Sequence, residues 1–333
     1  MLEDSLESIL GVGPKIAEQL KDAGYPTIES VAVTPPREIM EKTKIGFNKI
    51  LEIQKAAREM FSVDFKTAQE AYEKRKDMRK CTTGSPKLDK ILGGGIETQA
   101  LTELIGEYGT GKTQICLALS ITAQLPPEQG GLGGSVAFID TEGTFMPERV
   151  YGIASKMGQD PAVVAENIFV ARAYNSSHQC LLIDRLFTLC KENNVKLVIV
   201  DSMISHFRGE YMGRENLSER QQILNQYLHK LVRLAEAYNI AVVVTNQVQA
   251  NPATFFGDPN RPAGGNIMAH ACTHRVILRR GGKGTRLATI IDSPSLPEEK
   301  TRFKITEKGV EDAPEEKAGS KITEKDVEDA PEE

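Results

Sequence analysis

The residues best suited to chemistry form one octapeptide, GEYGTGKT at 106–113. It fits the spacing G-x-x-x-x-G-K-[ST], in which glycines let consecutive backbone N–H groups curl around phosphate oxygens. Lys112 would then reach the β- and γ-phosphates of a nucleotide, and the Thr113 hydroxyl would ligate Mg²⁺. The alternative is a degenerate loop that binds nucleotide without hydrolysing it. The candidate nucleotide-binding residues are Gly106, Glu107, Tyr108, Gly109, Thr110, Gly111, Lys112 and Thr113.

Two acidic residues follow other apolar runs and could complete such a site. Asp201 ends the run LVIVD at 197–201, where a carboxylate would hold Mg²⁺ or its water shell. Glu142 lies just beyond the run VAFID at 136–140, where it could polarise a water for attack on the γ-phosphate. By position alone, Glu142 could instead cap the next helix.

These groups need a sheet whose strands end at a common edge. Apolar runs alternate with helical stretches, and runs that are apolar on both faces suit an α/β fold with a mostly parallel sheet covered by helices. A helix is expected at 114–124, directly after the glycine-rich loop. The expected strands are 101–105, 135–140, 167–171, 196–200 and 240–245, with more alternating runs near 275–279, 286–291 and 302–306 that could extend the sheet as hairpins.

Changes in composition divide the chain into four segments. Residues 1–62 are predicted to be a small all-α domain, 63–80 a polar linker, 81–306 the α/β core and 307–333 an acidic, disordered tail. A repeat spans the end of the chain, as KITEKGVEDAPEE at 304–316 and KITEKDVEDAPEE at 321–333. Its first copy should begin as the last strand of the core, and the simplest interpretation gives the tail no function.

Composition narrows the class of protein. The longest apolar runs are strand-sized, far short of a membrane span, and the acidic N-terminus is unlike a signal peptide. Five scattered cysteines without metal-ligand spacing favour reduced thiols in a cytoplasmic protein. The net charge of −5 is unpromising for nucleic-acid binding. However, the tail holds eleven acids and four lysines, so the remainder of the chain is nearly neutral. Whether the protein can bind nucleic acid therefore depends on local basic patches and not on the net charge.

A set of motifs in fixed order is similar to the RecA-like DNA recombinase family, and most of all to its archaeal members, over essentially residues 1–312. The motifs are TTGSPKLDKILGGGIET (82–98), GEYGTGKTQIC (106–116), FIDTEGTF (138–145), LVIVDS (197–202), FRGEYMGRENLSERQQ (207–222), NQV (246–248), FFGDPNRPAGGNIMAH (255–270) and IDSPSLPE (291–298). The resemblance implies a RecA-like P-loop ATPase core that uses ATP and Mg²⁺. It makes Glu142 the catalytic glutamate, assisted by Lys112 and by Gln247 as a γ-phosphate sensor.

The resemblance also assigns residues to a subunit boundary. It makes His270 a sensor of nucleotide bound across that boundary. Arg149 and Pro297 would hold adenine from two neighbouring subunits. Asp292 would reach the neighbour's nucleotide, through a monovalent cation such as K⁺ in some members. Without the family, His270 and His274 could suggest a metal pair, although no third ligand is evident.

DNA contacts are expected from two loops and from the N-terminal domain. The first loop, 205–220, spaces arginines so that they can reach successive phosphates, unless it is merely a solvated charged loop; the second, roughly 248–266, is rich in Gly, Pro and Asn. The segment 10–25 resembles a helix–hairpin–helix whose glycines expose N–H groups to phosphate, although such domains sometimes serve protein contacts. The candidate residues are Arg208, Arg214, Arg220, Arg261, Gly264, Gly265, Gly11 and Gly13.

The linker motif FKTA at 65–68 resembles the family's polymerisation motif. Phe65 and Ala68, on an extended segment, would enter two apolar pockets of a neighbouring subunit, and strand addition would supply hydrogen bonds. Such a heterologous contact builds rings or open helical filaments. The alternative is that Phe65 packs within its own chain. One departure from the family is Met146, where arginine is usual, and we expect altered contact strength with activity retained.

The resemblance therefore implies an ATP-dependent filament on single-stranded DNA that promotes pairing and strand exchange with double-stranded DNA in recombination and repair. Two alternatives remain. A regulatory paralogue would assemble without exchanging strands, and it is disfavoured by the intact Glu142, both loops and the N-terminal domain. A ring-forming motor such as a replicative helicase is disfavoured by the Phe65 motif and the helix–hairpin–helix segment.

Overall fold

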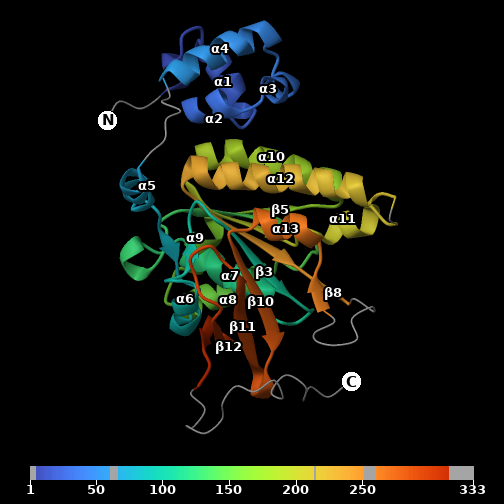
Figure 1. The fold of residues 1–333 in the computed structure, drawn as a ribbon. Coiled ribbons are helices and arrows are strands. Elements are labelled where there is room, and N and C mark those ends of the chain that lie inside the picture. The colour runs from blue at the N-terminus through green and yellow to red at the C-terminus, as the bar shows by residue number, and fades with distance from the viewer. Residues whose placement is uncertain (1–4, 61–66, 214, 251–259, 315–333) are drawn as a thin grey trace. The chain divides into compact units, whose positions relative to one another are not determined.

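The computed structural model of the chain describes residues 5–60, 67–213, 215–250 and 260–314 (Figure 1). The chain forms two compact units, residues 1–78 with 183–192 and residues 79–182 with 193–333. One hydrophobic cluster lies within the first unit and another within the second. Phe65, Arg214 and the second copy of the C-terminal repeat lie outside the described residues.

The N-terminal unit begins with a set of short helices, in agreement with the predicted all-α domain. Its hairpin turn needs glycine at Gly11, because φ is +88° there and a Cβ would lie 2.8 Å from the Nζ atom of Lys49. Gly13 then caps the next helix, whose first residue is Pro14. The helices are η1 (Leu6–Ser8), α1 (Pro14–Asp22), α2 (Ile28–Val33), α3 (Pro36–Lys42), α4 (Phe47–Met60) and α5 (Ala68–Arg75).

Helix α5 corrects the prediction of an extended segment at Ala68. Thr67 accepts a hydrogen bond from the backbone N–H of Glu70, and the Glu70 side chain accepts one from the N–H of Thr67. This reciprocal capping box starts the helix at Ala68, which is exposed.

The core unit is built on a nine-stranded sheet in the order β13-β12-β11-β10-β3-β7-β6-β4-β5 (Figure 1). The pairs from β10 to β5 are parallel, and β10 to β13 form an antiparallel extension. All eight predicted strands are confirmed. The strands are β3 (Leu101–Gly106), β4 (Ser135–Asp140), β5 (Ile168–Arg172), β6 (Val195–Asp201), β7 (Ala241–Asn246), β10 (His274–Arg280), β11 (Thr285–Asp292), β12 (Lys300–Thr306) and β13 (Gly309–Asp312).

Helices cover the two faces of this sheet, with α12 and α7 on opposite sides (Figure 1). Alternate strand residues, among them Phe138, Ile199 and Val243, form one hydrophobic cluster with α7 and α8. The helices are α6 (Pro86–Ile91), α7 (Lys112–Thr122), η2 (Pro127–Gln129), α8 (Pro147–Lys156), α9 (Pro161–Glu166), α10 (Ser176–Glu192), α11 (Ser205–Glu210), α12 (Leu217–Tyr238), α13 (Gly265–Ala271) and η3 (Gly282–Gly284). Two small ladders pair β1 (Lys80–Cys81) with β2 (Ile96–Glu97), and β8 (Val248–Ala250) with β9 (Asn260–Pro262).

Two predicted boundaries differ from the structure. The core does not end at 306, because Gly309–Asp312 adds strand β13 to the sheet and buries Val310. The prediction that a disordered tail starts at 307 is therefore wrong for residues 309–312. The segment 205–220 is also less of a loop than expected, since α11 covers 205–210 and α12 begins at 217. All five cysteines are buried, and none of them forms a disulfide within the described residues.

A buried ion pair joins three central strands. Glu103 on β3 is fully buried, and it accepts hydrogen bonds from Nε of Arg275 on β10 and from the Asn246 side chain on β7, both at 2.6 Å. Asn246 also donates to the carbonyl of Ala263 at 2.7 Å. The pair thus fixes the end of β7 relative to the segment that enters α13.

We expect Arg275→Met to destabilise the core, because it leaves the Glu103 carboxylate buried without its cation. Breaking such a pair costs about 3–5 kcal/mol of unfolding free energy, measured for the core transition by chemical denaturation. The matched control is Lys156→Met, which breaks the exposed Lys156–Glu307 pair (3.1 Å) and should cost less than about 1 kcal/mol. Equal losses in the two variants would contradict the prediction.

Candidate nucleotide-binding site

The glycine-rich loop joins the end of β3 to the start of α7. Gly109 and Gly111 have φ of +76° and +103°, and a Cβ on Gly106 would lie 2.6 Å from the carbonyl oxygen of Leu278. These glycines let the backbone curl tightly at the N-terminus of α7, which is a favourable place for an anion. The prediction of strand, loop and helix is confirmed, although α7 begins at Lys112, two residues earlier than expected.

Lys112 is held within this loop. Its Nζ atom donates to the carbonyl oxygens of Gly106 and Glu107, at 2.7 and 2.9 Å. Burial lowers the pKa of Lys112, and the charges of Asp201 and Glu142 partly oppose that shift. The ammonium group is therefore poised in a partly desolvated position, where an anionic ligand would gain more from it than in open water.

Thr113 and Asp201 meet across the site. The Thr113 hydroxyl donates to Oδ2 of Asp201 at 2.7 Å, and the Thr245 hydroxyl donates to Oδ1 of the same carboxylate. Burial raises the pKa of Asp201, while the hydrogen bonds from Thr245 and Thr113 and the Lys112 charge lower it. A buried carboxylate beside a threonine hydroxyl is a hard-oxygen donor set that suits Mg²⁺, so the residues present fit the predicted cation.

Glu142 lies at the same edge, in the turn that follows β4. Its side chain is exposed, and Oε1 accepts a hydrogen bond from Nε2 of Gln247 at 3.0 Å. Gln247 Oε1 in turn accepts from Nη1 of Arg208 at 3.4 Å. Two residues selected from the sequence as catalytic are thus in contact, and one selected for DNA joins them.

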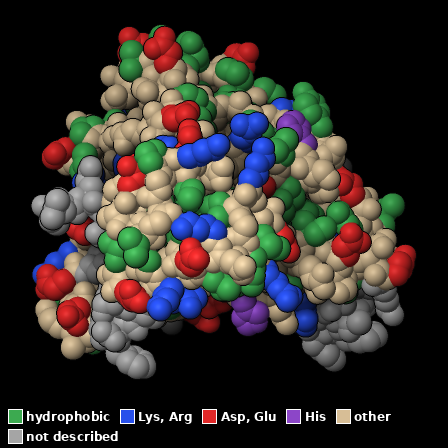
Figure 2. All heavy atoms as spheres, turned by 90° about the horizontal axis from the view of Figure 1, so that it is seen from above, with side chains coloured by type: hydrophobic (Ala, Val, Ile, Leu, Met, Phe, Trp, Pro, Cys, Tyr) green, Lys and Arg blue, Asp and Glu red, His purple; other side chains and the backbone are tan. Residues whose placement is uncertain are grey.

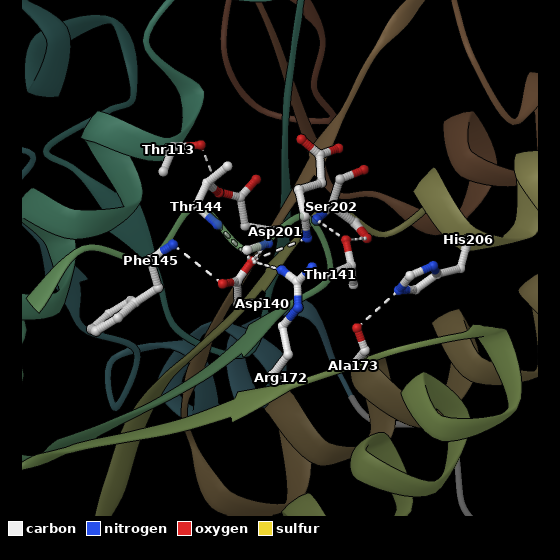
Figure 3. Close-up of polar contacts among 12 residues, drawn as sticks. Thr113, Asp140, Thr141, Thr144, Phe145, Arg172, Ala173, Asp201, Ser202 and His206 are labelled. Atoms are coloured by element: carbon white, nitrogen blue, oxygen red, sulfur yellow. Dashed lines mark hydrogen bonds and ion pairs between the residues drawn. The ribbon is translucent and has the colours of Figure 1, made fainter.

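Sequence reasoning missed the residue that shapes this turn. Asp140, the last residue of β4, accepts hydrogen bonds from four backbone N–H groups of the turn and from the Arg172 side chain (Figure 3). The turn is also tied to β6, because Thr141 and Ser202 exchange two hydrogen bonds of 2.7 and 3.0 Å. The sequence signal that could have identified Asp140 is an acidic residue at the end of a predicted strand with a glycine, Gly143, three residues later.

Arg280 is a second residue that the sequence did not single out. It ends β10, and its Nη2 atom donates to the carbonyl oxygen of Tyr108 at 3.1 Å. A Cβ on Gly109 would lie 2.4 Å from the same nitrogen, so the guanidinium packs directly on the loop. The Tyr108 side chain itself is 89% exposed.

Four residues are expected at a subunit boundary. Arg149 on α8 donates to the Gln114 side chain at 2.9 Å and to the Thr306 carbonyl. His270, Asp292 and Pro297 are exposed. Their roles toward a neighbouring subunit stay predictions.

The histidine pair gains no support as a metal site. His274 is buried, its Nδ1 lies 3.0 Å from the Ser293 hydroxyl and its Nε2 lies 3.7 Å from Oε2 of Glu97, whereas His270 is exposed. Among the described residues, no group of three His, Cys, Asp or Glu side chains could hold a metal ion.

The remaining DNA candidates are spread over several elements. Arg208 lies on α11 and Arg220 on α12, while Arg261 lies on β9. Gly264 and Gly265, with φ of +83° and +61°, form the start of α13. A DNA role for these residues stays a prediction.

Two known protein families together match most of the chain. A family model described as Rad51 matches residues 74–313, and one described as a SAM-like helix-hairpin-helix tandem matches residues 3–59. The chain belongs to the Rad51 family. A relative named DNA repair and recombination protein RadA, from Aeropyrum pernix, is 50% identical over 302 residues, which cover 91% of this chain and 95% of the relative. The RecA-like core and the helix–hairpin–helix domain that the sequence predicted are confirmed.

Within the described part of this Rad51-family chain, no helix is long and apolar enough to cross a membrane.

We expect Asp201→Asn to stabilise the metal-free protein at neutral pH. A raised pKa means that the folded state binds the proton more tightly than the unfolded state, so the stability contribution of Asp201 is lost as the pH rises through the raised pKa. The asparagine variant avoids this loss, and its unfolding temperature should exceed that of the wild type. The difference in unfolding temperature between the variant and the wild type should become smaller as the pH falls.

The measurement is thermal unfolding between pH 4 and 8, with and without Mg²⁺ and nucleotide. Mg²⁺ with nucleotide should stabilise the wild type and leave the variant nearly unchanged. A variant that is less stable at neutral pH without metal would contradict the assignment of burial as the dominant influence on this carboxyl.

Proposed function

We propose that this chain is a DNA-dependent ATPase whose protomers assemble on single-stranded DNA and promote homologous pairing and strand exchange with double-stranded DNA. The observation that carries the proposal is the hydrogen-bonded series from Glu142 to Gln247 to Arg208. It joins the group proposed to activate water to helix α11, whose Arg208 is a cation suited to a DNA phosphate. Membership of the Rad51 family and the name of the A. pernix relative support it.

ATP would bind on the glycine-rich loop. The N–H groups at the start of α7 and the Lys112 ammonium would hold its β- and γ-phosphates. Thr113 and Asp201 would hold Mg²⁺, which supplies charge neutralisation at the phosphates when it is bound. Glu142 would orient the attacking water and accept its proton, while Gln247 would contact the γ-phosphate in place of Glu142.

The same contacts would couple nucleotide to DNA. If Gln247 turns from Glu142 to a γ-phosphate, its bond to Arg208 must be remade. That exchange would favour one position of α11 when ATP is bound and another after hydrolysis. Base pairing between the DNA strands, and not protein–base contact, would supply sequence specificity.

DNA binding would depend on local cations. Figure 2 shows Lys and Arg side chains interspersed with Asp and Glu side chains on the face seen from above, in keeping with the small net charge. Arg208, Arg220 and Arg261 would therefore act as individual phosphate contacts. In the N-terminal unit, Gly11 and Gly13 present an exposed hairpin beside Lys49, which suits one further phosphate.

Self-association would use the edge of the sheet. Strand β5 is an outer strand, and Val170 on it is 45% exposed. An outer strand with an exposed apolar side chain can accept an added strand from another chain. The segment that carries Phe65 is the proposed donor, so repetition of this contact gives rings or helical filaments.

ATP would lie at the seam between protomers. Arg149 would hold adenine from one side, and Pro297 would hold it from the adjoining protomer. His270 and Asp292 would reach the neighbour's phosphates, Asp292 through K⁺ or a similar cation. Binding at a seam makes nucleotide occupancy and assembly mutually stabilising. We place the working assembly in the cytoplasm, with the nucleoid.

We expect Glu142→Gln to lower kcat for ATP hydrolysis by about 10²–10⁴-fold while KM for ATP changes little, because the amide cannot accept a proton from water. The matched control is Glu148→Gln, an exposed glutamate in the first turn of α8, which should keep wild-type kcat. The measurement is phosphate release with and without single-stranded DNA.

A D-loop assay on the wild type decides between recombinase and paralogue. Pairing that requires ATP supports the proposal, whereas DNA-stimulated hydrolysis without pairing identifies a regulatory paralogue. Directional unwinding of a forked duplex would identify a motor instead.

We expect Val170→Asp to block assembly, because a charge on the outer strand opposes strand addition. Electron microscopy with single-stranded DNA and a non-hydrolysable ATP analogue should show filaments or rings for the wild type and dispersed protein for the variant. Val163→Asp is the control, since Val163 on α9 is 54% exposed and lies off the edge strand. Normal assembly of the Val170 variant would exclude β5 as the acceptor.

A further inference from the structure

The Asp140 carboxylate organises the turn that carries Glu142. Asp140 is 5% exposed, and its two oxygens face successive backbone N–H groups of the turn rather than solvent (Figure 3). These N–H groups belong to Glu142 (3.1 Å), Gly143 (2.7 Å), Thr144 (3.2 Å) and Phe145 (3.2 Å). The carboxylate therefore fixes the backbone path on both sides of the Glu142 side chain.

Arg172 closes this arrangement from the neighbouring strand. It ends β5 directly opposite Asp140 in the parallel register, and its Nη1 atom lies 3.2 Å from Oδ1 of Asp140. Gly143 has a φ of +75°, and a Cβ at that position would lie 2.6 Å from the same nitrogen. The guanidinium thus lies against the turn itself, and the positive φ at this position favours glycine.

The saturation of Asp140 argues against a second role as a ligand of Mg²⁺. Oδ1 alone faces three N–H groups and the Arg172 cation, which leaves little lone-pair capacity for a metal. By contrast, the two hydrogen bonds to the Asp201 carboxylate come from hydroxyl groups, which can rotate away when a cation binds. The two strand-end acids therefore have different tasks.

We infer that Asp140 and Arg172 are positioning residues for Glu142. The inference rests on the proposed catalytic role of Glu142, whose exposed side chain has to be aimed chiefly by its own backbone. A general base must lie within hydrogen-bond reach of its water, and a displacement of about 1 Å can lower the rate by about 10²-fold. Asp140 supplies the acceptor set that holds the turn, and Arg172 holds Asp140 in the orientation that presents it.

The decisive variant is Asp140→Asn. The amide presents one oxygen and one NH₂ group to a turn that offers only donors, so at least one N–H loses its acceptor. We expect kcat for ATP hydrolysis to fall about 10- to 100-fold. KM for ATP, the Mg²⁺ concentration at half-maximal rate and the affinity for a non-hydrolysable analogue should stay within about twofold of the wild-type values. The glycine-rich loop and Lys112 are unchanged in this variant, and the Asp140 charge is the smallest of the influences on the pKa of Asp201.

The matched control is Asp160→Asn. Asp160 also accepts backbone N–H groups, those of Ala162 and Val163 at the start of α9, but it caps an exposed helix away from the site. Its kcat should equal the wild-type value. A loss of kcat in Asp140→Asn that is accompanied by an equal loss of nucleotide affinity would show a general structural role and overturn the inference.

Variants of Arg172 provide a second, independent test of the inference. Its side chain is 38% exposed, so Arg172→Gln should fold even if the Asp140 variant does not. We expect a smaller fall in kcat, about 3- to 10-fold, with partial recovery in Arg172→Lys. Because Arg172 acts through Asp140, the double variant Asp140→Asn with Arg172→Gln should be no slower than Asp140→Asn alone.

The outcomes separate the two proposals. Wild-type protein without DNA-stimulated hydrolysis would defeat the proposed function. Active wild-type protein with unchanged kcat in Arg172→Gln, or with multiplicative losses in the double variant, would defeat the positioning role alone.

Discussion

The parallel register of β3, β7, β6 and β4 is the constraint on which the rest of this molecule depends. In four adjacent parallel strands, all carboxyl ends lie at one edge. Four parts of the proposed site follow from that edge: the glycine-rich loop after β3, Gln247 after β7, Asp201 at the end of β6 and Glu142 after β4. A slip of one residue in any pair would reverse the direction of the side chains beyond it.

The sequence predicted those strands and loops whose structure is encoded by a short stretch of neighbouring residues. Apolar runs such as 197–201 are buried on both faces, so they stand out as strands, and the spacing of Gly106, Gly111 and Lys112 encodes the phosphate loop by itself. The roles of Asp140 and Arg280 could not be read in this way. Asp140 matters because the backbone after it curls back onto its carboxylate, and Arg280 matters because β10 lies beside β3.

The two segments that were predicted wrongly, 309–312 and 205–210, also depend on contacts with residues far away in the sequence. Strand β13 is four residues long and buries only Gly309 and Val310 among acidic neighbours, so its composition resembles the tail that follows. Its place in the sheet comes from pairing with β12 and from Asp312, which accepts hydrogen bonds from the Ser85 hydroxyl and the Lys87 N–H. Those contacts span most of the core in sequence, and no local pattern reports them. The helix at 205–210 likewise depends on distant partners, since His206 Nε2 lies 3.1 Å from the Ala173 carbonyl and Glu210 accepts from Ser176.

The core contains two kinds of buried charge, and they have different roles. Glu103 and Arg275 neutralise each other between central strands, and their hydrogen bonds fix Asn246, the residue before Gln247. At the site, burial raises the pKa of Asp201 and lowers that of Lys112, so both charged forms are disfavoured without a ligand. A cation beside Asp201 and a phosphate beside Lys112 would relieve both penalties together. Ligand binding would then stabilise the fold through the same two groups that would hold the ligand, and a protomer that lost its phosphate would lose that stabilisation.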